Sequence, residues 1–560
     1  MLLIALTFAY ITFTTINFGA CVNAFFKIRT SDFAMVAIQG LFGITMFTTC
    51  WAIFGRIHWE FHVALLALNL VLFGVFRNAV TACYRMLRIR FSKLPMSLKV
   101  FLFFTILLIL AKSASAPFVL DNESYYIQTI KWLNEYGMVK GLANLHVFFA
   151  QMSGWHIAQS AFSFSFLYPH FNDLSGYCLI LSSLYAVFRL DDFSHTGSKI
   201  ALTMGLLPIT GAFLLQFCGA PSPDIPILVL SFLALDVFLN RNINETRGSF
   251  ALLAILVLFA LFIKITSVAL VILPLYVLVK ERNVVSKRLF LASAVVLGLF
   301  CIRNAITSGL PLFPLPFDFG LQSVHAMPNA VASYFFAESR PFAYGLTKAE
   351  FEVMPLHEIL WSWMHQPKLH GLFNIIAVLL VLIVPFFIRR FFHKKSMWIA
   401  YFAMAVQLCL LLLLSPQYRF FMNFILFFGL FMISCLVNAN RNVFILLVMG
   451  SVTSFIVVFI PLQLNSVTNN ELIGKTTAFS LNQVFFPHPN TRSEQTFIAV
   501  KNGNLRYNSP VNSDFFWKTS NGPLPCVNKQ QVDFFEINFR IRPQLRNGNL
   551  ADGFVSDTVR

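Results

Sequence analysis

The chain has 560 residues, of which 57% are hydrophobic and only 12% are charged, and its mean hydropathy is +0.71. In a typical soluble domain roughly a quarter of the residues are charged, whereas each membrane crossing needs about 20 apolar residues in succession. The composition therefore excludes a water-soluble globular protein and predicts an all-α, polytopic bundle of transmembrane helices. The formal net charge of +17 does not indicate nucleic acid as a partner, because the basic residues fall largely in short loops between apolar stretches.

Apolar stretches follow one another along most of the chain and predict about fourteen spans. They lie near residues 1–19, 33–54, 61–80, 99–118, 174–190, 199–218, 225–240, 249–263, 265–280, 289–302, 371–388, 397–414, 420–437 and 443–464. The stretch 249–280 leaves two alternatives, one long span or two short spans around Lys264. The first span lacks the basic start of a signal peptide, so we expect it to be retained.

Three basic loops give an orientation for these spans. Cytoplasmic loops of membrane proteins carry an excess of Lys and Arg, and the predicted order of spans places all three loops on one side. Their basic residues are Arg85, Arg88, Arg90, Lys93 and Lys99, then Lys280, Arg282, Lys287 and Arg288, then Arg389, Arg390, Lys394 and Lys395. We expect a multi-pass protein of the bacterial inner (plasma) membrane, with its N-terminus on the periplasmic side.

Because successive spans cross the membrane in alternating directions, the same order of spans places four other segments on the periplasmic side. They are 119–173, 219–224, 303–370 and 465–560. The last of these is rich in Asn, Ser, Pro and Gly and is expected to form a small extracytoplasmic α+β domain. The nine cysteines contain no CxxC pair, so neither a zinc site nor a disulfide framework is indicated.

Asp121 ends an apolar span and opens the sequence LDNESYYIQTIKWLNEYG. The following residues predict an amphipathic helix over 122–136 that lies in the membrane interface and ends at Gly137. Asp121 either caps this helix or acts chemically at the membrane surface. A second acid, Asp224 in GAPSPDIPI, has the same two readings. Acids at this depth are costly and are usually functional.

Cations are predicted at the same outer level. Lys264 lies in FIKIT, Arg303 in RNAITSGLPLFP and Arg419 in SPQYRFF. Arginine and lysine side chains are suited to phosphate recognition, although each of them could equally snorkel to lipid headgroups. Three cations on the outer side are unexpected under the positive-inside rule. Their presence there therefore favours a phosphate-binding role.

Further polar and aromatic residues crowd the outer loop 119–173. They are candidates for substrate contact, with interfacial packing as the alternative. These residues are Glu123, Tyr125, Tyr126, Gln128, His146, Trp155 and His156. The spacing of the two histidines does not fit an HxxxH metal pair, and no cysteine lies close enough in sequence to complete a zinc set.

The segment DNESYYIQTIKWLNEYG, with its acid placed directly after a span, resembles the GT-C superfamily of polytopic glycosyltransferases. The segments GAPSPD, FIKIT, RNAITSGLPLFP and SPQYRFF are similar to elements of bacterial members. The resemblance covers roughly 99–464 as a GT-C-like core and leaves the helices of 1–98 and the tail 465–560 outside it. The chain also resembles an uncharacterised bacterial membrane-protein family with GT-C-like architecture.

The resemblance implies transfer of a sugar from a polyprenyl-phosphate or diphosphate donor to a glycan, lipid or protein acceptor, with inversion. The position that matches the catalytic acid is Asp121. Because Asn122 separates Asp121 from Glu123, the base could be either acid, and a divalent cation stays open as a cofactor. In this reaction we expect Lys264, Arg303 and Arg419 to stabilise the charge that develops on the leaving phosphate, with Asp224 in the same donor-binding site.

Three alternatives from other classes remain. An envelope glycolipid polymerase or ligase would share the lipid-linked substrate. A transporter of such a substrate would show broken helices and charges inside the membrane, whereas the predicted spans keep their charges at the ends. A non-enzymatic membrane assembly subunit would use the tail to dock an unknown protein partner.

Overall fold

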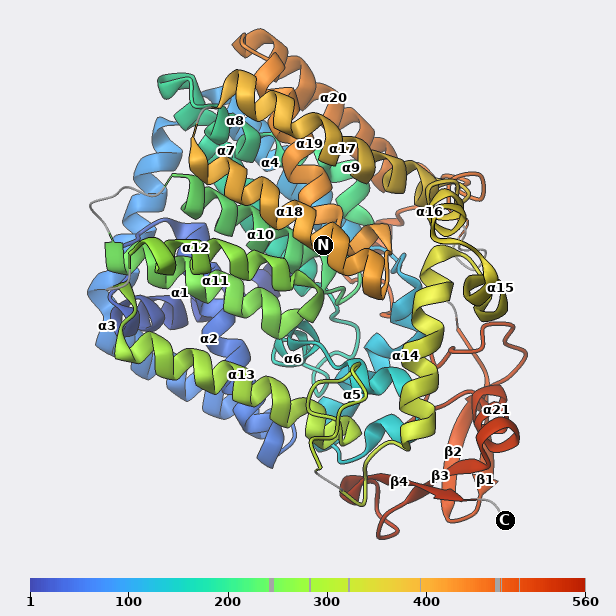
Figure 1. Ribbon diagram of the computed structural model, residues 1–560. Helices are drawn as coiled ribbons and strands as arrows, with labels where there is room; N and C mark the ends of the chain where they lie inside the picture. The colour runs from blue at the N-terminus through green and yellow to red at the C-terminus, as the bar shows by residue number, and fades with distance from the viewer. Residues whose placement is uncertain are drawn as a thin grey trace.

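The computed structural model describes residues 1–240, 246–281, 284–320, 323–392, 394–468, 474, 476–492 and 494–558. Most of this chain is helical, and long helices lie side by side across the molecule (Figure 1). The C-terminal domain packs at one end of this bundle, beside α14 (Asn329–Tyr344). Arg282, one of the basic residues of a predicted cytoplasmic loop, lies outside the described residues.

The N-terminal half of the chain contributes a first set of helices. They are α1 (Leu2–Phe26), α2 (Phe33–Phe54), α3 (Trp59–Lys93), α4 (Met96–Ser113), α5 (Ile127–Tyr136), α6 (Gly154–Ser160), α7 (Leu174–Thr196), α8 (Lys199–Gly205), α9 (Gly211–Leu214) and α10 (Asp224–Leu239). The second half adds α11 (Thr246–Ile263), α12 (Ile272–Lys280), α13 (Lys287–Ser308), α15 (Lys348–Val353), α16 (Leu356–Met364), α17 (Leu369–Phe391), α18 (Lys395–Leu414), α19 (Met422–Leu436) and α20 (Asn440–Phe459).

The membrane character of the bundle is supported, but the count of fourteen spans is not confirmed. Nine helical segments within the described ranges are long and apolar enough to cross a bilayer. The predicted spans that do not reach this standard fall on α7, α10, α11, α12 and α19, which are too short or too polar. Several of these helices are buried among the others. Because they contact neighbouring helices and not lipid, they do not need the length of an apolar span.

Two predicted spans are interrupted. The span 199–218 breaks after α8 into short helical turns around Pro208. The stretch 249–280 ends its first helix at Ile263, and Lys264 takes an extended conformation before a 3₁₀ turn leads into α12. The chain therefore forms two segments around Lys264. At membrane depth, such non-helical backbone is tolerated where it is buried in protein or lines a cavity.

The C-terminal domain has the mixed α+β content predicted for the tail. β1 (Phe497–Asn502) pairs antiparallel with β2 (Leu505–Pro510), and β3 (Ile541–Leu545) pairs antiparallel with β4 (Phe554–Thr558). The helix α21 (Lys529–Phe539) lies between the two hairpins in sequence.

This domain docks on the loop that follows α5. The backbone N–H of Phe554 donates to the carbonyl of Lys140 at 2.9 Å. Gly553 has a φ of 92°, and a Cβ at this position would lie 2.0 Å from the same carbonyl oxygen. The contact therefore requires glycine, both for its conformation and for the close approach of the two chains.

Candidate functional site

Asp121 precedes an unusual helical turn. Residues Asn122–Tyr126 form a π-helical turn that continues into α5 and ends at Gly137, whose φ is 77°. Such turns are rare and are frequent at functional sites. The side chain of Asp121 makes no capping hydrogen bond, so its carboxylate is free to bond elsewhere.

The predicted helix over 122–136 therefore exists, but it is largely buried and does not lie free in the interface. Its polar side is covered by the C-terminal domain. The side-chain amide of Gln128 donates to the carbonyls of Ser520 and Gly522, and Lys131 donates to the carbonyl of Gly522 at 2.6 Å. The tail supplies the hydrogen bonds that water would have supplied to an interfacial helix.

The carboxylate of Asp121 forms an ion pair with Arg419. Nη1 of Arg419 lies 2.7 Å from Oδ2 of Asp121, with exposed side-chain fractions of 31% and 21%. The hydroxyl of Tyr126 donates to the same carboxylate oxygen at 3.4 Å. Arg419 lies in a 3₁₀ turn between α18 and α19, so a break between two helices brings it to the π-helical turn.

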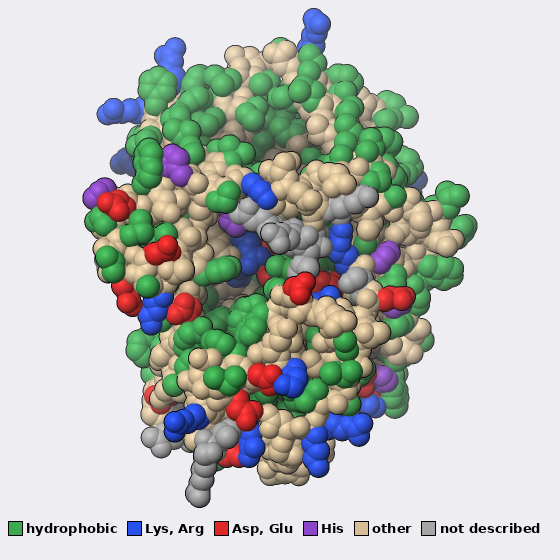
Figure 2. Space-filling model, turned by 90° about the vertical axis from the view of Figure 1, so that its right-hand side faces the viewer, with side chains coloured by type: hydrophobic (Ala, Val, Ile, Leu, Met, Phe, Trp, Pro, Cys, Tyr) green, Lys and Arg blue, Asp and Glu red, His purple; other side chains and the backbone are tan. Residues whose placement is uncertain are grey.

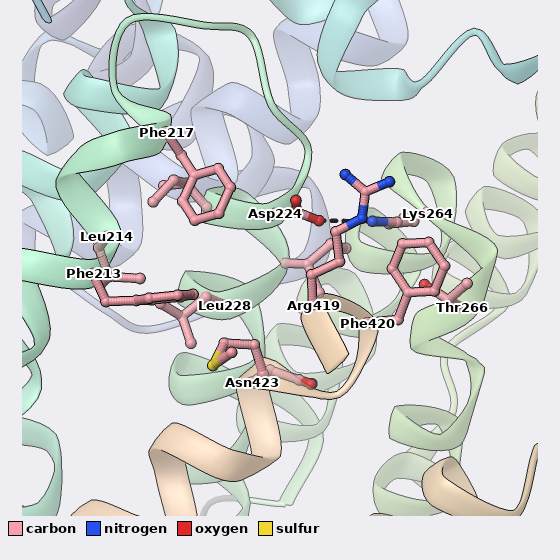
Figure 3. A pocket seen from close by; sticks show the side chains of 13 residues that line it. Phe213, Leu214, Phe217, Asp224, Leu228, Lys264, Thr266, Arg419, Phe420 and Asn423 are labelled. Atoms are coloured by element: carbon pink, nitrogen blue, oxygen red, sulfur yellow. Dashed lines mark hydrogen bonds and ion pairs between the residues drawn. The ribbon is translucent and has the colours of Figure 1, made fainter. Parts of the chain in front are cut away.

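A second ion pair lies beside the first. Nζ of Lys264 is 2.7 Å from Oδ1 of Asp224 at the start of α10 (Figure 3). The ammonium group also sits 4.0 Å from the centroid of the Phe420 ring, a favourable cation–π arrangement. The hydroxyl of Ser222 donates to the other oxygen of Asp224 at 3.3 Å. Each ionic group is thus held by more than one partner.

The second pair and Arg419 line a small cavity, and Phe213 and Phe217 form part of its apolar wall (Figure 3). Its volume of about 20 Å³ accommodates roughly one water molecule. Asn423 also lines it. Its amide nitrogen donates to Ser231 at 2.9 Å, whereas Oδ1 is buried without a hydrogen-bond partner in the described part of the chain.

Arg419 connects the two pairs electrostatically. Burial alone would lower the pKa of its guanidinium, but the carboxylates of Asp121 and Asp224 raise that pKa well above the usual value. The four ionic groups form a compact cluster of two acids and two bases, which we call the four-residue cluster: Asp121, Asp224, Lys264 and Arg419. Its members come from four separate segments of the chain.

Aromatic side chains lie behind Asp121. The rings of Tyr125 and Tyr126 meet edge to face at 4.7 Å, and the ring of His156 lies 4.7 Å from that of Tyr126. Burial, together with the charges of Arg303 and Lys264, lowers the pKa of His156 to about 3, so this imidazole is neutral. Its Nδ1 accepts the N–H of Ser153 at 3.2 Å.

Glu123 and Gln128 lie close to the site but contact the C-terminal domain. The carboxylate of Glu123 accepts from the hydroxyl of Thr491 at 2.7 Å and from the N–H of Arg492 at 2.9 Å. Asp121 is therefore the acid that faces the basic residues of the cluster. Glu123 and Gln128 hold the tail against the π-helical turn.

Three other predicted residues lie outside the cavity. Arg303 donates to the carbonyl of Phe262 at 3.1 Å and stacks over its ring, which supports the end of α11 next to Lys264. Nε1 of Trp155 donates to the hydroxyl of Ser175 at 3.1 Å. The ring of His146 packs 5.6 Å from that of Trp517 in the tail. These side chains support the surroundings of the cluster.

Sequence reasoning missed Phe420 and Asn423. Asn423 gave a signal, because a polar residue within an apolar segment is unusual. Phe420 gave none, since its role as a partner of Lys264 depends on tertiary contact.

The site does not fit a divalent cation. Within the described residues, no three His, Cys, Asp or Glu side chains gather as a metal site would require. Both acids of the cluster already face protein cations at 2.7 Å.

The cluster lies towards the end of the bundle that carries the C-terminal domain. Figure 2 shows this end of the molecule, where a hollow with basic side chains inside it opens near the middle of the face. A profile of the family described as Domain of unknown function (DUF8201) matches residues 1–426.

The chain belongs to this family. No curated protein and no solved structure matches it. The matched range contains all four members of the cluster and ends within α19. The helix α20 and the C-terminal domain lie beyond the match, although the domain contacts the π-helical turn next to Asp121.

Proposed function

We propose that this protein is a membrane glycosyltransferase that moves a sugar from a polyprenyl-phosphate or diphosphate donor to an acceptor at the outer face of a bacterial inner membrane. The observation that carries the proposal is the four-residue cluster. It combines an acid at the end of a span with two cations that could receive a phosphate. The resemblance of the same segments to the GT-C superfamily supports it.

Each member of the cluster has a role in this reaction. Asp121 accepts the proton of the acceptor hydroxyl as its oxygen attacks the anomeric carbon. The bond between that carbon and the phosphate oxygen breaks on the opposite face, which inverts the configuration. Arg419 and Lys264 stabilise the charge that develops on the departing phosphate, and Asp224 positions Lys264.

The small size of the cavity adds a condition. A volume of about 20 Å³ admits water but not a sugar phosphate, and Arg419 already occupies one carboxylate oxygen of Asp121, the proposed base. The site must therefore rearrange when the donor binds. A donor phosphate that takes Arg419 away from Asp121 would release the carboxylate for proton transfer, which couples arrival of the donor to activation of the base.

The test is sugar transfer in proteoliposomes that contain the full chain and polyprenyl-phosphate-linked radiolabelled sugars. Asp121→Asn should abolish transfer, because an amide cannot accept the proton, while membrane insertion and thermal stability show that the variant folds. Asp557→Asn makes the same chemical change at a side chain that is 54% exposed in β4 and should leave transfer intact. Normal transfer by Asp121→Asn would refute the proposal.

A transporter of a lipid-linked substrate is the second candidate. The break at Lys264 favours it, because transporters place charged groups at interrupted helices. Passage of a fluorescent polyprenyl phosphate between leaflets, measured in the same vesicles without any acceptor, separates the two. Passage that survives Asp121→Asn, with no sugar transfer by either protein, would favour the transporter.

A further inference from the structure

An apolar groove opens on the outside of the bundle between α4 and α20. Its volume is about 300 Å³, at the lower limit of cavities that bind small ligands. Its walls include Phe101, Phe104, Val448 and Phe455, and the rings of Phe104 and Phe455 stack at 6.3 Å. A groove of this composition on a membrane-facing surface suits a hydrocarbon chain.

The groove lies on the lipid-facing side of the two helices. Beside its walls, Phe103 is 69% exposed, and within it Phe444 is 55% exposed. Large apolar side chains exposed on two neighbouring helices are expected to face lipid in a membrane protein. The groove is therefore open to the bilayer.

The groove leads towards the four-residue cluster. Phe101 and Ser451 line both the groove and a second cavity of about 20 Å³ between α4, α7 and α20. Leu214 lines that second cavity and also the charged cavity that contains Asp224, Lys264 and Arg419. The middle cavity is thus a neighbour of both the groove and the charged cavity, with at least one lining residue in common with each.

The middle cavity is narrow and is bordered by small side chains. A Cβ at Gly211 would lie 2.6 Å from Oγ of Ser454, and a Cβ at Gly450 would lie 2.7 Å from the Cα of Ile209. The two glycines therefore allow α20 to pack closely against the short helical segment that contains α9.

We propose that the groove between α4 and α20 binds the hydrocarbon chain of a phosphate-bearing lipid, whose phosphate reaches Lys264 and Arg419 through the middle cavity. This inference rests on the lipid-linked substrate of the proposed function. Charge complementarity favours a phosphate-bearing lipid over the acyl chains of the bulk bilayer, which would fill the groove but would bring no phosphate to the cations. In the proposed complex, the groove binds the hydrocarbon chain and the two cations bind the phosphate.

Photolabelling tests this directly. The full chain is reconstituted in phosphatidylcholine vesicles with a small fraction of polyprenyl phosphate that carries a diazirine in its chain, and crosslinked peptides are mapped by mass spectrometry. We expect labels concentrated on α4 and α20 and removed by an excess of unlabelled polyprenyl phosphate. Lys264→Met should reduce them several-fold, because the phosphate loses its anchor.

Two variants should block lipid binding and one should not. Ser451→Phe places a large side chain at a residue that lines both the groove and the middle cavity. Val448→Trp fills the groove from its lipid-facing side, where a larger side chain is compatible with folding, and both variants should lose the labels. Met449→Phe is the matched control, because Met449 is 59% exposed on the same helix and lines none of the three cavities.

Three results would overturn the inference. They are equal labelling of other lipid-facing helices, labels that persist in both blocking variants, and equal labelling by a phosphatidylcholine that carries the diazirine in an acyl chain, which would make the groove a site for bulk lipid. Photolabelling does not depend on catalytic turnover. Labelling of the groove without any sugar transfer therefore refutes the proposed glycosyltransferase activity but supports lipid binding in the groove. Sugar transfer without labelling of the groove refutes only the proposed lipid-binding site.

Discussion

Asp121 and Arg419 are 298 positions apart in the chain, yet their carboxylate and guanidinium groups meet at 2.7 Å. The contact joins the π-helical turn before α5 to the turn before α19. Since Arg419 also lines the cavity of the second ion pair, one arginine ties both acids of the cluster together. Loss of this arginine should therefore affect both halves of the site.

Arg419→Gln should destabilise the protein. Breaking a buried pair costs about 3–5 kcal/mol, and partial exposure of both side chains should reduce this to roughly 1–3 kcal/mol through solvent screening. Thermal unfolding in detergent measures the change. The double variant Asp121→Asn/Arg419→Gln should recover part of the loss, because it leaves no unpaired carboxylate at this position. A double variant less stable than the sum of both single changes would contradict this account.

Phe420→Leu should remove the cation–π interaction that helps to position the ammonium group of Lys264. The change keeps an apolar side chain but removes the ring whose face lies 4.0 Å from the ammonium group, at a cost of about 1 kcal/mol. Phe420→Tyr retains the ring and is the matched control. Sugar transfer and thermal unfolding should both fall with Leu and remain near the native values with Tyr. Equal effects of both changes would show that the ring face does not matter.

Thr519→Val should loosen the turn that carries Asp121. The Thr519 hydroxyl donates to the carbonyl of Ser124 at 2.6 Å, and its N–H donates to that of Glu123 at 2.9 Å. Without the hydroxyl, we expect faster hydrogen exchange across the π-helical turn and α5, because the carbonyl of Ser124 loses a partner. Thr558→Val, at an exposed residue of β4, should leave exchange in that region unchanged. Unchanged exchange in Thr519→Val would show that the tail does not hold the turn.

Acidification should destabilise the folded outer loop that contains His146 and His156. Burial lowers the pKa of His146 to about 4 and that of His156 to about 3. Both imidazoles are neutral in the folded protein, and their stabilising effect is complete above the unfolded value near 6.5. It is lost as the pH falls from about 6.5 towards 4, because the unfolded state binds more protons.

Thermal unfolding between pH 7 and pH 4 (about the range where both groups differ between the two states) measures this dependence. Nδ1 of His146 accepts the N–H of Phe148 at 3.1 Å, an interaction that a second ring proton would abolish. His146→Asn keeps an acceptor that does not titrate and should flatten the dependence on pH. A dependence as steep as in the native protein would place its origin in other groups.

The membrane class of this protein followed from composition, since no soluble fold buries so much apolar surface. Asp121, Asp224, Lys264 and Arg419 were also found as candidates, because charged residues at the ends of apolar stretches are costly and therefore conspicuous. The number of full spans was not predictable in the same way. An apolar stretch such as 225–240 can either cross lipid or lie buried among other helices, and both give the same sequence pattern.

The amino-acid sequence by itself indicated a helical membrane protein and singled out the few ionic residues that needed partners. Only the tertiary structure decided that Arg419 pairs with Asp121, that Lys264 pairs with Asp224, and that Glu123 holds the tail. The physical reason is that hydropathy is a local property of the chain, whereas an ion pair depends on which distant segments the packing of the helices brings together.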